Sequence, residues 1–474
     1  MPTNTKRRIG VLHSLLVLAV AAFLGGCATF STDGGLDVAG TIARDKLGLN
    51  VASVLPDDPQ SAQRAEVTAL LRQPLTADAA AQIALYSNPG LQAAYAELRV
   101  VEADRVQAGR LPNPGYSYKR LGSDAGSSFE NKLGINLGAI LTLPLAENVE
   151  QQRFESAKLK AAAQTVAVAL GARRAWVDAV AARQGAEYMQ QVVESAEAGR
   201  ELANRMRAVG NWSRLDEHRE QLFYAEAAAQ RARAEQAAVA AREQLVRTLG
   251  LWGGELGFTL PARLPDLPGA PRELIEAERV AVEQRLDIRA ARRNLDAEAE
   301  MLGLTRVTRW VNVLHIEGIR EREADGSVKR GFEIGINIPL FDWGDARVAK
   351  AEALYLQAAL QLRETAVNAR SEVREAWHAY RIAYDLARHY RDEIVPLRKR
   401  VSDEQLLRYN GMLVGVFELI ADARDQVASI NAYLQALRDS WLAEADLQQA
   451  LLGRADAGRR GGSVAMPAGG AAGH

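Results

Sequence analysis

The sequence has little of what most chemical sites require. Its 474 residues include one cysteine, which leaves no disulfide and no cysteine-based metal site. Aromatic residues make up only 6% of the chain, which suits closely packed helices better than one large globular core. The 58 basic and 59 acidic residues nearly cancel, so we expect no nucleic-acid partner.

Catalytic motifs are also missing. There is no glycine-rich phosphate loop, no Ser/His/Asp signature and no HExxH sequence. With 6 methionines and 6 scattered histidines, no metal relay is expected either. We therefore expect no enzyme activity, no cofactor and no metal site. The histidines are His13, His218, His315, His378, His389 and His474.

One hydrophobic run lies near the amino terminus. Residues 1–26 combine basic residues with the apolar run Val11 to Leu24, which is typical of a secretory signal and short for a membrane span. Leu24-Gly25-Gly26 precedes Cys27, and this arrangement resembles a bacterial lipobox. The resemblance implies lipidation of Cys27 with diacyl and N-acyl (palmitate) chains, and Ala28 is associated with sorting to the outer membrane. The alternative is an ordinary signal peptide with an incidental cysteine.

The rest of the chain contains two similar halves. Three pairs of stretches match at a constant offset of 201 residues, which indicates an internal two-fold repeat. The pairs are Gly134–Leu137 with Gly335–Ile338, Ala175-Trp176 with Ala376-Trp377, and Gly210 with Gly411. We expect an extended N-terminal segment at 27–73, a first repeat at 74–264, a second at 265–453 and a disordered tail at 454–474.

Each half contains a predicted β-hairpin followed by a very long helix. Hydrophobic and polar residues alternate within hairpins at 111–145 and 306–341, giving strands of about 10 to 12 residues, enough for tilted strands to cross a bilayer. Tyr116 and Tyr118 are expected at a membrane interface. His315 and Glu317 are expected to share a polar face. Four strands cannot close a sheet in lipid, so three chains would supply a barrel of twelve strands. A soluble sheet with one buried face would explain the alternation equally well.

The helices provide a test of length. The helix predicted at 147–208 would be about 93 Å long, close to the summed lengths of the helices at 76–109 and 212–249. We expect the two shorter helices to stack end to end beside the long one, with Thr76 as an N-cap. In the second half, 272–306 and 413–452 would stack beside 344–409, which Pro396 should kink. Trp176 and Trp377 are expected to be packing anchors.

These features together resemble the TolC-type outer-membrane efflux factors. Asn88-Pro89 with the later Leu111-Pro112-Asn113-Pro114, the IPLFDWGDAR segment from Ile338, and RYNGMLVGVFEL from Arg408 carry the resemblance, which covers about 75–453. It implies a homotrimer with a transmembrane β-barrel continuous with a periplasmic helical barrel. It also implies docking to a periplasmic adaptor and an inner-membrane pump, in efflux or type I secretion. The YNGMLVGVFEL stretch is most similar to factors that accompany metal-resistance systems, copper included.

The resemblance also implies roles for the two turns that end the long helices. Gly210 and Gly411 are expected at the tips of coiled-coil hairpins that dock the adaptor. Beyond the second tip we expect apolar packing to close the pore, with acids nearby, although these residues could simply be buried between helices. The candidates are Leu413, Phe417 and Ile420, with Glu418 and Asp422. The alternative function is a periplasmic adaptor lipoprotein, which would have one coiled-coil hairpin rather than two.

Overall fold

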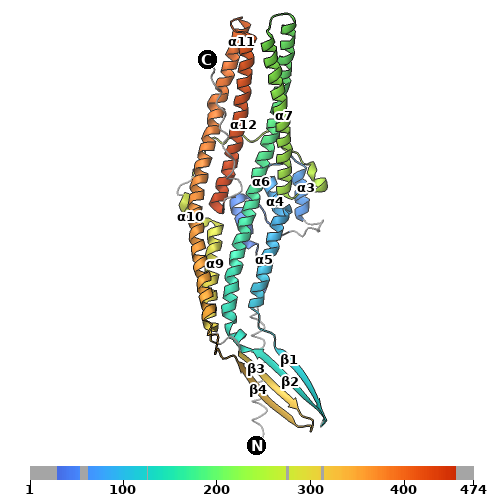
Figure 1. Ribbon diagram of the computed structural model, residues 1–474, viewed down its shortest axis with the longest axis vertical. Helices are drawn as coiled ribbons and strands as arrows, with labels where there is room; N and C mark the ends of the chain where they lie inside the picture. Colours follow the sequence, from blue (N-terminus) through green and yellow to red (C-terminus); the bar gives the residue numbers. More distant parts are fainter. Residues whose placement is uncertain (1–28, 54–61, 125, 274–276, 311–313, 455–474) are drawn as a thin grey trace.

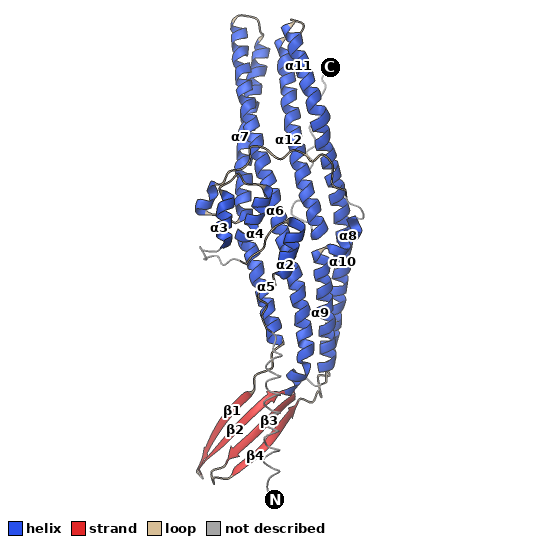
Figure 2. Ribbon diagram, turned by 180° about the vertical axis from the view of Figure 1, so that it is seen from behind, coloured by secondary structure: helices blue, strands red, loops and turns tan. Residues whose placement is uncertain are grey.

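The computed structural model describes residues 29–53, 62–124, 126–273, 277–310 and 314–454. It is a long helical bundle with a four-stranded antiparallel sheet at one end (Figures 1 and 2). The helices of the first half are α2 (Asp37–Ile42), η1 (Ala43–Leu47), α3 (Ala62–Leu71), α4 (Ala77–Ser87), α5 (Pro89–Ala108), α6 (Leu137–Ala208), α7 (Arg214–Leu249) and η2 (Gly253–Gly257). Those of the second are α8 (Ala277–Gln284), α9 (Leu286–Thr308), α10 (Asp345–His389), η3 (Tyr390–Ile394), α11 (Val395–Asn410) and α12 (Val416–Leu452).

The expected end-to-end stacking of shorter helices is confirmed. Figure 1 shows α5 and α7 following one another along α6, and α9 and α12 following one another along α10. Thr76 caps α4, because its side chain accepts a hydrogen bond from the Ala79 N–H at 3.1 Å. Trp176 is buried, and its indole Nε1 donates to the Leu75 carbonyl at 2.6 Å. Trp377 packs against the same core, so both tryptophans are packing anchors as expected.

The first end-to-end joint depends on Asn88. Its side-chain oxygen accepts from the Leu91 N–H at 2.9 Å, which caps α5, and its Nδ2 donates to the Thr248 carbonyl at 2.8 Å. One side chain therefore begins α5 and binds the end of α7. Gly250 completes the joint in a left-handed conformation, with φ of 74°. A Cβ at Gly250 would lie 2.4 Å from the Ser87 carbonyl oxygen, so only glycine fits there.

Gly250→Ala is expected to destabilise the bundle by more than about 1 kcal/mol, the cost of a left-handed alanine alone, because the backbone of α4 and α5 must also move. Gly253→Ala is the matched control: its φ is 60°, but nothing lies within 4 Å of the added methyl group. Denaturant unfolding followed by circular dichroism measures both variants. If Gly250→Ala and Gly253→Ala lose equal stability, the close contact at Gly250 does not contribute to the free energy of unfolding.

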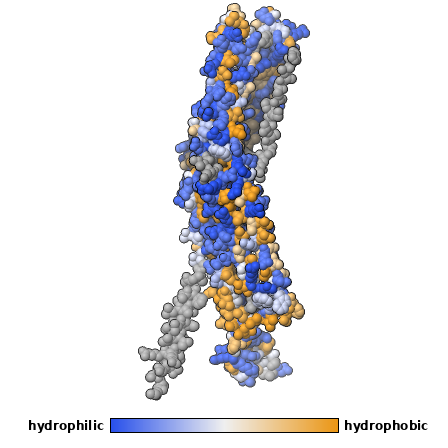
Figure 3. All heavy atoms as spheres, turned by 90° about the vertical axis from the view of Figure 1, so that its left-hand side faces the viewer, coloured by the Kyte–Doolittle hydropathy of each residue, from blue (hydrophilic) through white to orange (hydrophobic). Residues whose placement is uncertain are grey.

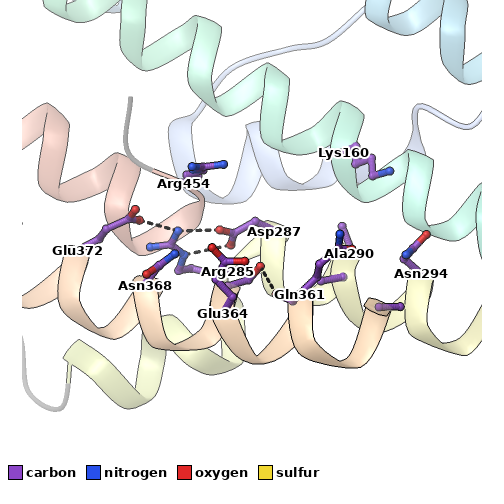
Figure 4. Close-up of a pocket in the computed structure, with 13 residues that line it drawn as sticks. Lys160, Arg285, Asp287, Ala290, Asn294, Gln361, Glu364, Asn368, Glu372 and Arg454 are labelled. Atoms are coloured by element: carbon purple, nitrogen blue, oxygen red, sulfur yellow. Dashed lines mark hydrogen bonds and ion pairs between the residues drawn. The ribbon is translucent and has the colours of Figure 1, made fainter. Parts of the chain in front are cut away.

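At the second end-to-end joint, between α9 and α12, Arg285 occupies the position that Asn88 has at the first joint. Arg285 lies between α8 and α9, is 1% exposed, and donates from Nη1 to the Ala450 carbonyl near the end of α12 at 3.1 Å. Figure 4 shows its guanidinium between Asp287 of α9 and Glu372 of α10. Its Nη2 lies 2.7 Å from Asp287 Oδ2 and 2.9 Å from Glu372 Oε2. A buried ionic cluster therefore holds this joint together.

The segment between the halves crosses the middle of the bundle. Arg183 of α6 donates from Nη1 to the Leu260 carbonyl at 2.7 Å. Further along, the Tyr384 hydroxyl of α10 donates to the Pro268 carbonyl at 2.7 Å, and the Tyr380 hydroxyl accepts from the Arg272 N–H at 2.8 Å. Side chains of both long helices thus satisfy the backbone of this crossing, which ties the halves to one another.

The sheet has the order β1-β2-β3-β4, and all neighbouring strands are antiparallel. Its strands are β1 (Gly115–Ser123), β2 (Gly126–Asn136), β3 (Leu314–Arg322) and β4 (Val328–Ile336). In register, Ile135 of β2 pairs with Ile316 of β3, which pairs with Ile334 of β4. Two hairpins that lie far apart in the sequence therefore form one sheet, and β1 and β4 are its edges.

Some expected strand boundaries are wrong. The first hairpin ends at Asn136 rather than 145, because the Asn136 side chain accepts from the Ala139 N–H at 3.0 Å and caps α6 there. Pro144 consequently lies inside α6. In the second half, α9 extends to Thr308, the described part of β3 starts at Leu314, and β4 ends at Ile336 rather than at 341. Residues 311–313 lie outside the described part of the chain.

Two other expectations have different outcomes. The segment at 27–73 is helical in part rather than extended: α2 and η1 pack on α6, and Leu49 is 4% exposed in a core cluster with Phe154. Pro396 was expected to kink the last long helix; a π-helical turn, η3, ends two residues before it, and the kink itself stays a prediction. A π-turn lets the helix continue past a residue that has no N–H to donate.

Candidate functional site

One face of the sheet carries charge. On this face Lys132 Nζ lies 3.0 Å from Glu333, 3.2 Å from Glu130 and 3.9 Å from Glu317. Three carboxylates thus surround one ammonium group, which leaves an excess of negative charge. His315 lies on the same face two residues before Glu317, so the expected sharing of a polar face is confirmed.

The opposite face is apolar and exposed in the single chain. Phe332 is 78% exposed and Leu133 is 60% exposed, where a folded chain in water would bury such side chains. This apolar face consists of Tyr116, Tyr118, Leu133, Ile135, Leu314, Ile316, Phe332, Ile334 and Ile336. In Figure 3 hydrophobic atoms gather over the lower part of the molecule, and hydrophilic atoms follow at its lower end.

Aromatic side chains mark the junction between this sheet and the helices. Trp310 follows α9 and Trp343 precedes α10, and their rings meet edge to face with centroids 5.8 Å apart. Phe341 beside them is 98% exposed. Exposed indole and phenyl rings at one end of an apolar strand surface are typical of a membrane interface.

The first helical tip is a compact turn. Gly210 adopts φ of 79°, and the Asn211 N–H returns to the Met206 carbonyl at 2.9 Å. A capping box begins α7: Asp216 N–H donates to Ser213 Oγ at 3.2 Å, and Ser213 N–H donates to Asp216 Oδ2 at 3.3 Å. Trp212 is buried in this turn.

The second tip differs from the first by one residue. Gly411 has φ of −79°, and the left-handed position is taken by Met412, with φ of 59°. Met412 is thus the backbone counterpart of Gly210, and its N–H donates to the Tyr409 carbonyl at 2.9 Å. Met412 is 94% exposed and Leu413 is 74% exposed. A left-handed methionine is strained, and this turn presents two apolar side chains to the outside.

The two helical hairpins are joined near their tips by a pair that the sequence analysis missed. Arg424 of α12 donates from Nη2 to Glu220 Oε1 of α7 at 2.9 Å, and the Glu220 side chain is 3% exposed. The Arg424 guanidinium also stacks on Phe223 at 4.3 Å from the ring centroid. The partners are 204 residues apart, so no local pattern could have revealed them.

The aperture candidates all lie in the second tip and the first turns of α12. Leu413 and Glu418 are exposed, Ile420 is half-buried, and the side chain of Phe417 lies outside what the structure describes. Asp422 is 7% exposed, and its Oδ2 has no hydrogen-bond partner among the described residues. These residues share one end of the molecule, and their role as an aperture stays a prediction.

Several other expectations fall outside the described residues or concern absences. Cys27 and the signal at 1–26 precede the described part, and the tail is described only as far as Arg454. Among the described helices, none is both long and apolar enough to cross a membrane. In the same residues no group of three or more His, Cys, Asp or Glu side chains is placed to hold a metal ion.

Solved structures with the same architecture are outer-membrane channels. CusC has a TM-score of 0.68 at 17% identity, covering 80% of this chain and 92% of its own. The CmeC outer-membrane channel of Campylobacter jejuni gives 0.69 at 14% identity, covering 90% and 92%. The MtrE outer-membrane channel of Neisseria gonorrhoeae, in its open state, gives 0.67 at 19% identity, covering 78% and 88%. No family model and no curated protein matches the sequence.

The chain therefore has the fold of the TolC-type outer-membrane efflux channels. The similarity extends over most of the chain and most of each channel. The two helical hairpins of this chain also differ from the single hairpin expected of a periplasmic adaptor.

Proposed function

We propose that this chain is the outer-membrane channel of a tripartite efflux or type I secretion system, working as a homotrimer. It conducts substrate passively from an inner-membrane pump and a periplasmic adaptor, and Cys27 carries a lipid anchor in the outer membrane. The sheet is the observation that carries this proposal. It has an exposed apolar face, a charged face and two free edges, at the end of a long helical bundle.

Free strand edges are the reason for the trimer. Unpaired backbone groups at β1 and β4 cost several kcal/mol each in lipid, so a single four-stranded sheet cannot stay inserted. Edge-to-edge pairing of three copies gives a closed barrel of twelve strands. The apolar face then meets lipid, and Lys132 with its three carboxylates faces the lumen. The internal repeat supplies the two hairpins of each protomer by duplication.

The full chain, expressed with its signal and purified in detergent, tests this proposal. We expect a trimer by native mass spectrometry, acyl chains on Cys27, and discrete conductance steps in a planar bilayer. Cys27→Ser keeps the barrel and loses the acyl chains, which separates the anchor from the channel. A monomer that forms no channel in any bilayer would refute the proposed function.

Adaptor docking at the tips gives a prediction about Met412. Met412→Gly is expected to raise stability by about 1 kcal/mol, because glycine adopts the left-handed conformation without strain. The same change should weaken adaptor binding by about 2 kcal/mol, the worth of one buried methionine side chain. Unfolding in denaturant and calorimetric titration with the adaptor that co-purifies with the chain measure the two effects.

The matched control for this prediction is Val239→Ala on α7. Val239 is 63% exposed but lies away from the tips, so its truncation should leave adaptor affinity unchanged. If Met412→Gly gains stability but binds the adaptor as tightly as the wild type, the docking surface does not include Met412.

A further inference from the structure

Four arginines lie at the far end of the apolar face of the sheet. Strand register places Arg320 of β3 directly opposite Arg330 of β4, and Arg120 and Arg322 on either side of Phe129 in the next row. All four are exposed. They share a face with Leu133 and Phe332, since residues two apart on a strand point to the same side.

The charged face at the same depth is arranged differently. There Lys119 lies opposite Glu130, and Lys329 lies opposite Glu321 and forms an ion pair with Glu323. Each of these two lysines therefore has a glutamate directly opposite it in the register.

On the apolar face, like charges oppose one another. Arg320, Arg322 and Arg330 have no carboxylate within 4.0 Å among the described residues. Directly opposed like charges destabilise a strand pair, and the acids that could compensate point to the other side. An anion from outside the protein is the partner that this arrangement lacks.

The surface beside this pair is hollowed. A cavity of about 250 Å³ is lined by Tyr116, Leu133, Gly318, Arg320 and Arg330, among others. Gly318 pairs with Leu133 and Phe332 and contributes no side chain, which leaves room in the row before the arginines. Guanidinium groups hold phosphate oxygens through two parallel hydrogen bonds, so the hollow offers an apolar wall and two phosphate donors together.

We propose that this arginine belt, Arg120, Arg320, Arg322 and Arg330, binds the phosphate groups of outer-leaflet lipid headgroups. The inference rests on the proposed function, which puts the strand turns at the outer surface and the helical tips in the periplasm. From Ile334 to the Arg330 row is four residues, about 13 Å along the strand. With the strand turns at the outer surface, the apolar rows lie on the acyl-chain side of the arginines, and the arginines lie on the headgroup side.

Native mass spectrometry of the detergent-purified trimer tests the proposal, with phosphatidic acid and phosphatidylcholine as titrated lipids. Phosphatidic acid exposes its phosphate, whereas choline covers that of phosphatidylcholine. We expect the wild type to prefer phosphatidic acid about thirtyfold, the effect of two basic residues at an anionic surface. Arg320→Gln with Arg330→Gln should abolish that preference. Lys119→Gln with Lys329→Gln removes the same charge from the opposite face and should retain it.

Three results would overturn the inference. They are equal wild-type affinity for the two lipids, a preference that survives loss of Arg320 and Arg330, and inorganic phosphate that binds the trimer as tightly as phosphatidic acid. The first needs no variant, so misfolding of a substituted chain cannot hide the answer. A trimer that conducts in bilayers but shows no lipid preference overturns only this inference, whereas a chain that forms no channel overturns the proposed function itself.

Discussion

Replacing Arg285 with methionine is expected to lower the free energy of unfolding by about 3 to 5 kcal/mol. The guanidinium is 1% exposed and holds Asp287, Glu372 and the Ala450 carbonyl together. Burial by itself lowers the pKa of Arg285, but hydrogen bonds and charge from Asp287 and Glu372 outweigh it, and the net shift of the pKa is upward. Arg285→Met therefore leaves two carboxylates around a buried gap.

Chemical denaturation followed by far-ultraviolet circular dichroism measures this loss. Arg293→Met on α9, the helix that follows Arg285, is the control: its side chain is half exposed and lies 3.9 Å from Asp296, so the change should cost less than about 1 kcal/mol. Combining Arg285→Met with Asp287→Asn and Glu372→Leu removes both unpaired acids and should restore most of the stability. If Arg285→Met unfolds at the wild-type denaturant concentration, the cluster does not support the joint.

The helix boundaries were predictable from sequence because their signals are local. Thr76 and Gly109 act within one helical turn of their own positions, and they lie at the two ends of the helical stretch expected at 76–109. Gly250 was predictable as a helix terminus for the same reason. Its close contact with Ser87 was not, because that depends on how α7 meets α4.

The strand boundaries were harder because the residues after Asn136 are apolar on both faces. The run from Leu137 to Leu145 has leucine, isoleucine or alanine at six of its nine positions, including Ile140 on the otherwise less apolar face, so alternation did not distinguish a strand from a helix. The run is helical because the Asn136 side chain accepts a hydrogen bond from the Ala139 N–H and so caps the start of α6. The matching Asn337 is followed by no helix until Asp345, so similar sequences have different structures in the two halves.

The interactions that join elements could not be predicted at all. Arg285 reads as one more basic residue in an arginine-rich helix, and only the fold brings Glu372 and Ala450 to it. The pairing of β2 with β3, and with it the arginine belt, equally requires the two hairpins to meet. The sequence therefore indicates the class of structure and many of the helix ends. The chemistry of the surfaces depends on tertiary contacts, which the sequence does not show.

Arg424→Gln is expected to raise the open fraction of the channel by at least about tenfold, because charged hydrogen bonds are worth about 1.5 to 3 kcal/mol. The prediction rests on the proposed function. Arg424 connects α12 of the second hairpin to Glu220 of α7 in the first, close to the tips. Losing this pair leaves the buried Glu220 carboxylate without its guanidinium, and separating the hairpins would hydrate that carboxylate. Planar-bilayer recordings of the purified trimer measure the open fraction directly.

Arg398→Gln is a close control for this experiment. The Arg398 side chain is 36% exposed, as is that of Arg424, and it lies 3.1 Å from Asp425, but both partners belong to the second hairpin. Removing it takes away the same charge without releasing one hairpin from the other, so the open fraction should stay at the wild-type value. Equal opening in the two variants would mean that loss of positive charge at the tip, rather than the link between hairpins, controls the pore. Unchanged conductance in both would mean that apolar packing around Leu413 and Ile420 is enough to hold the pore closed.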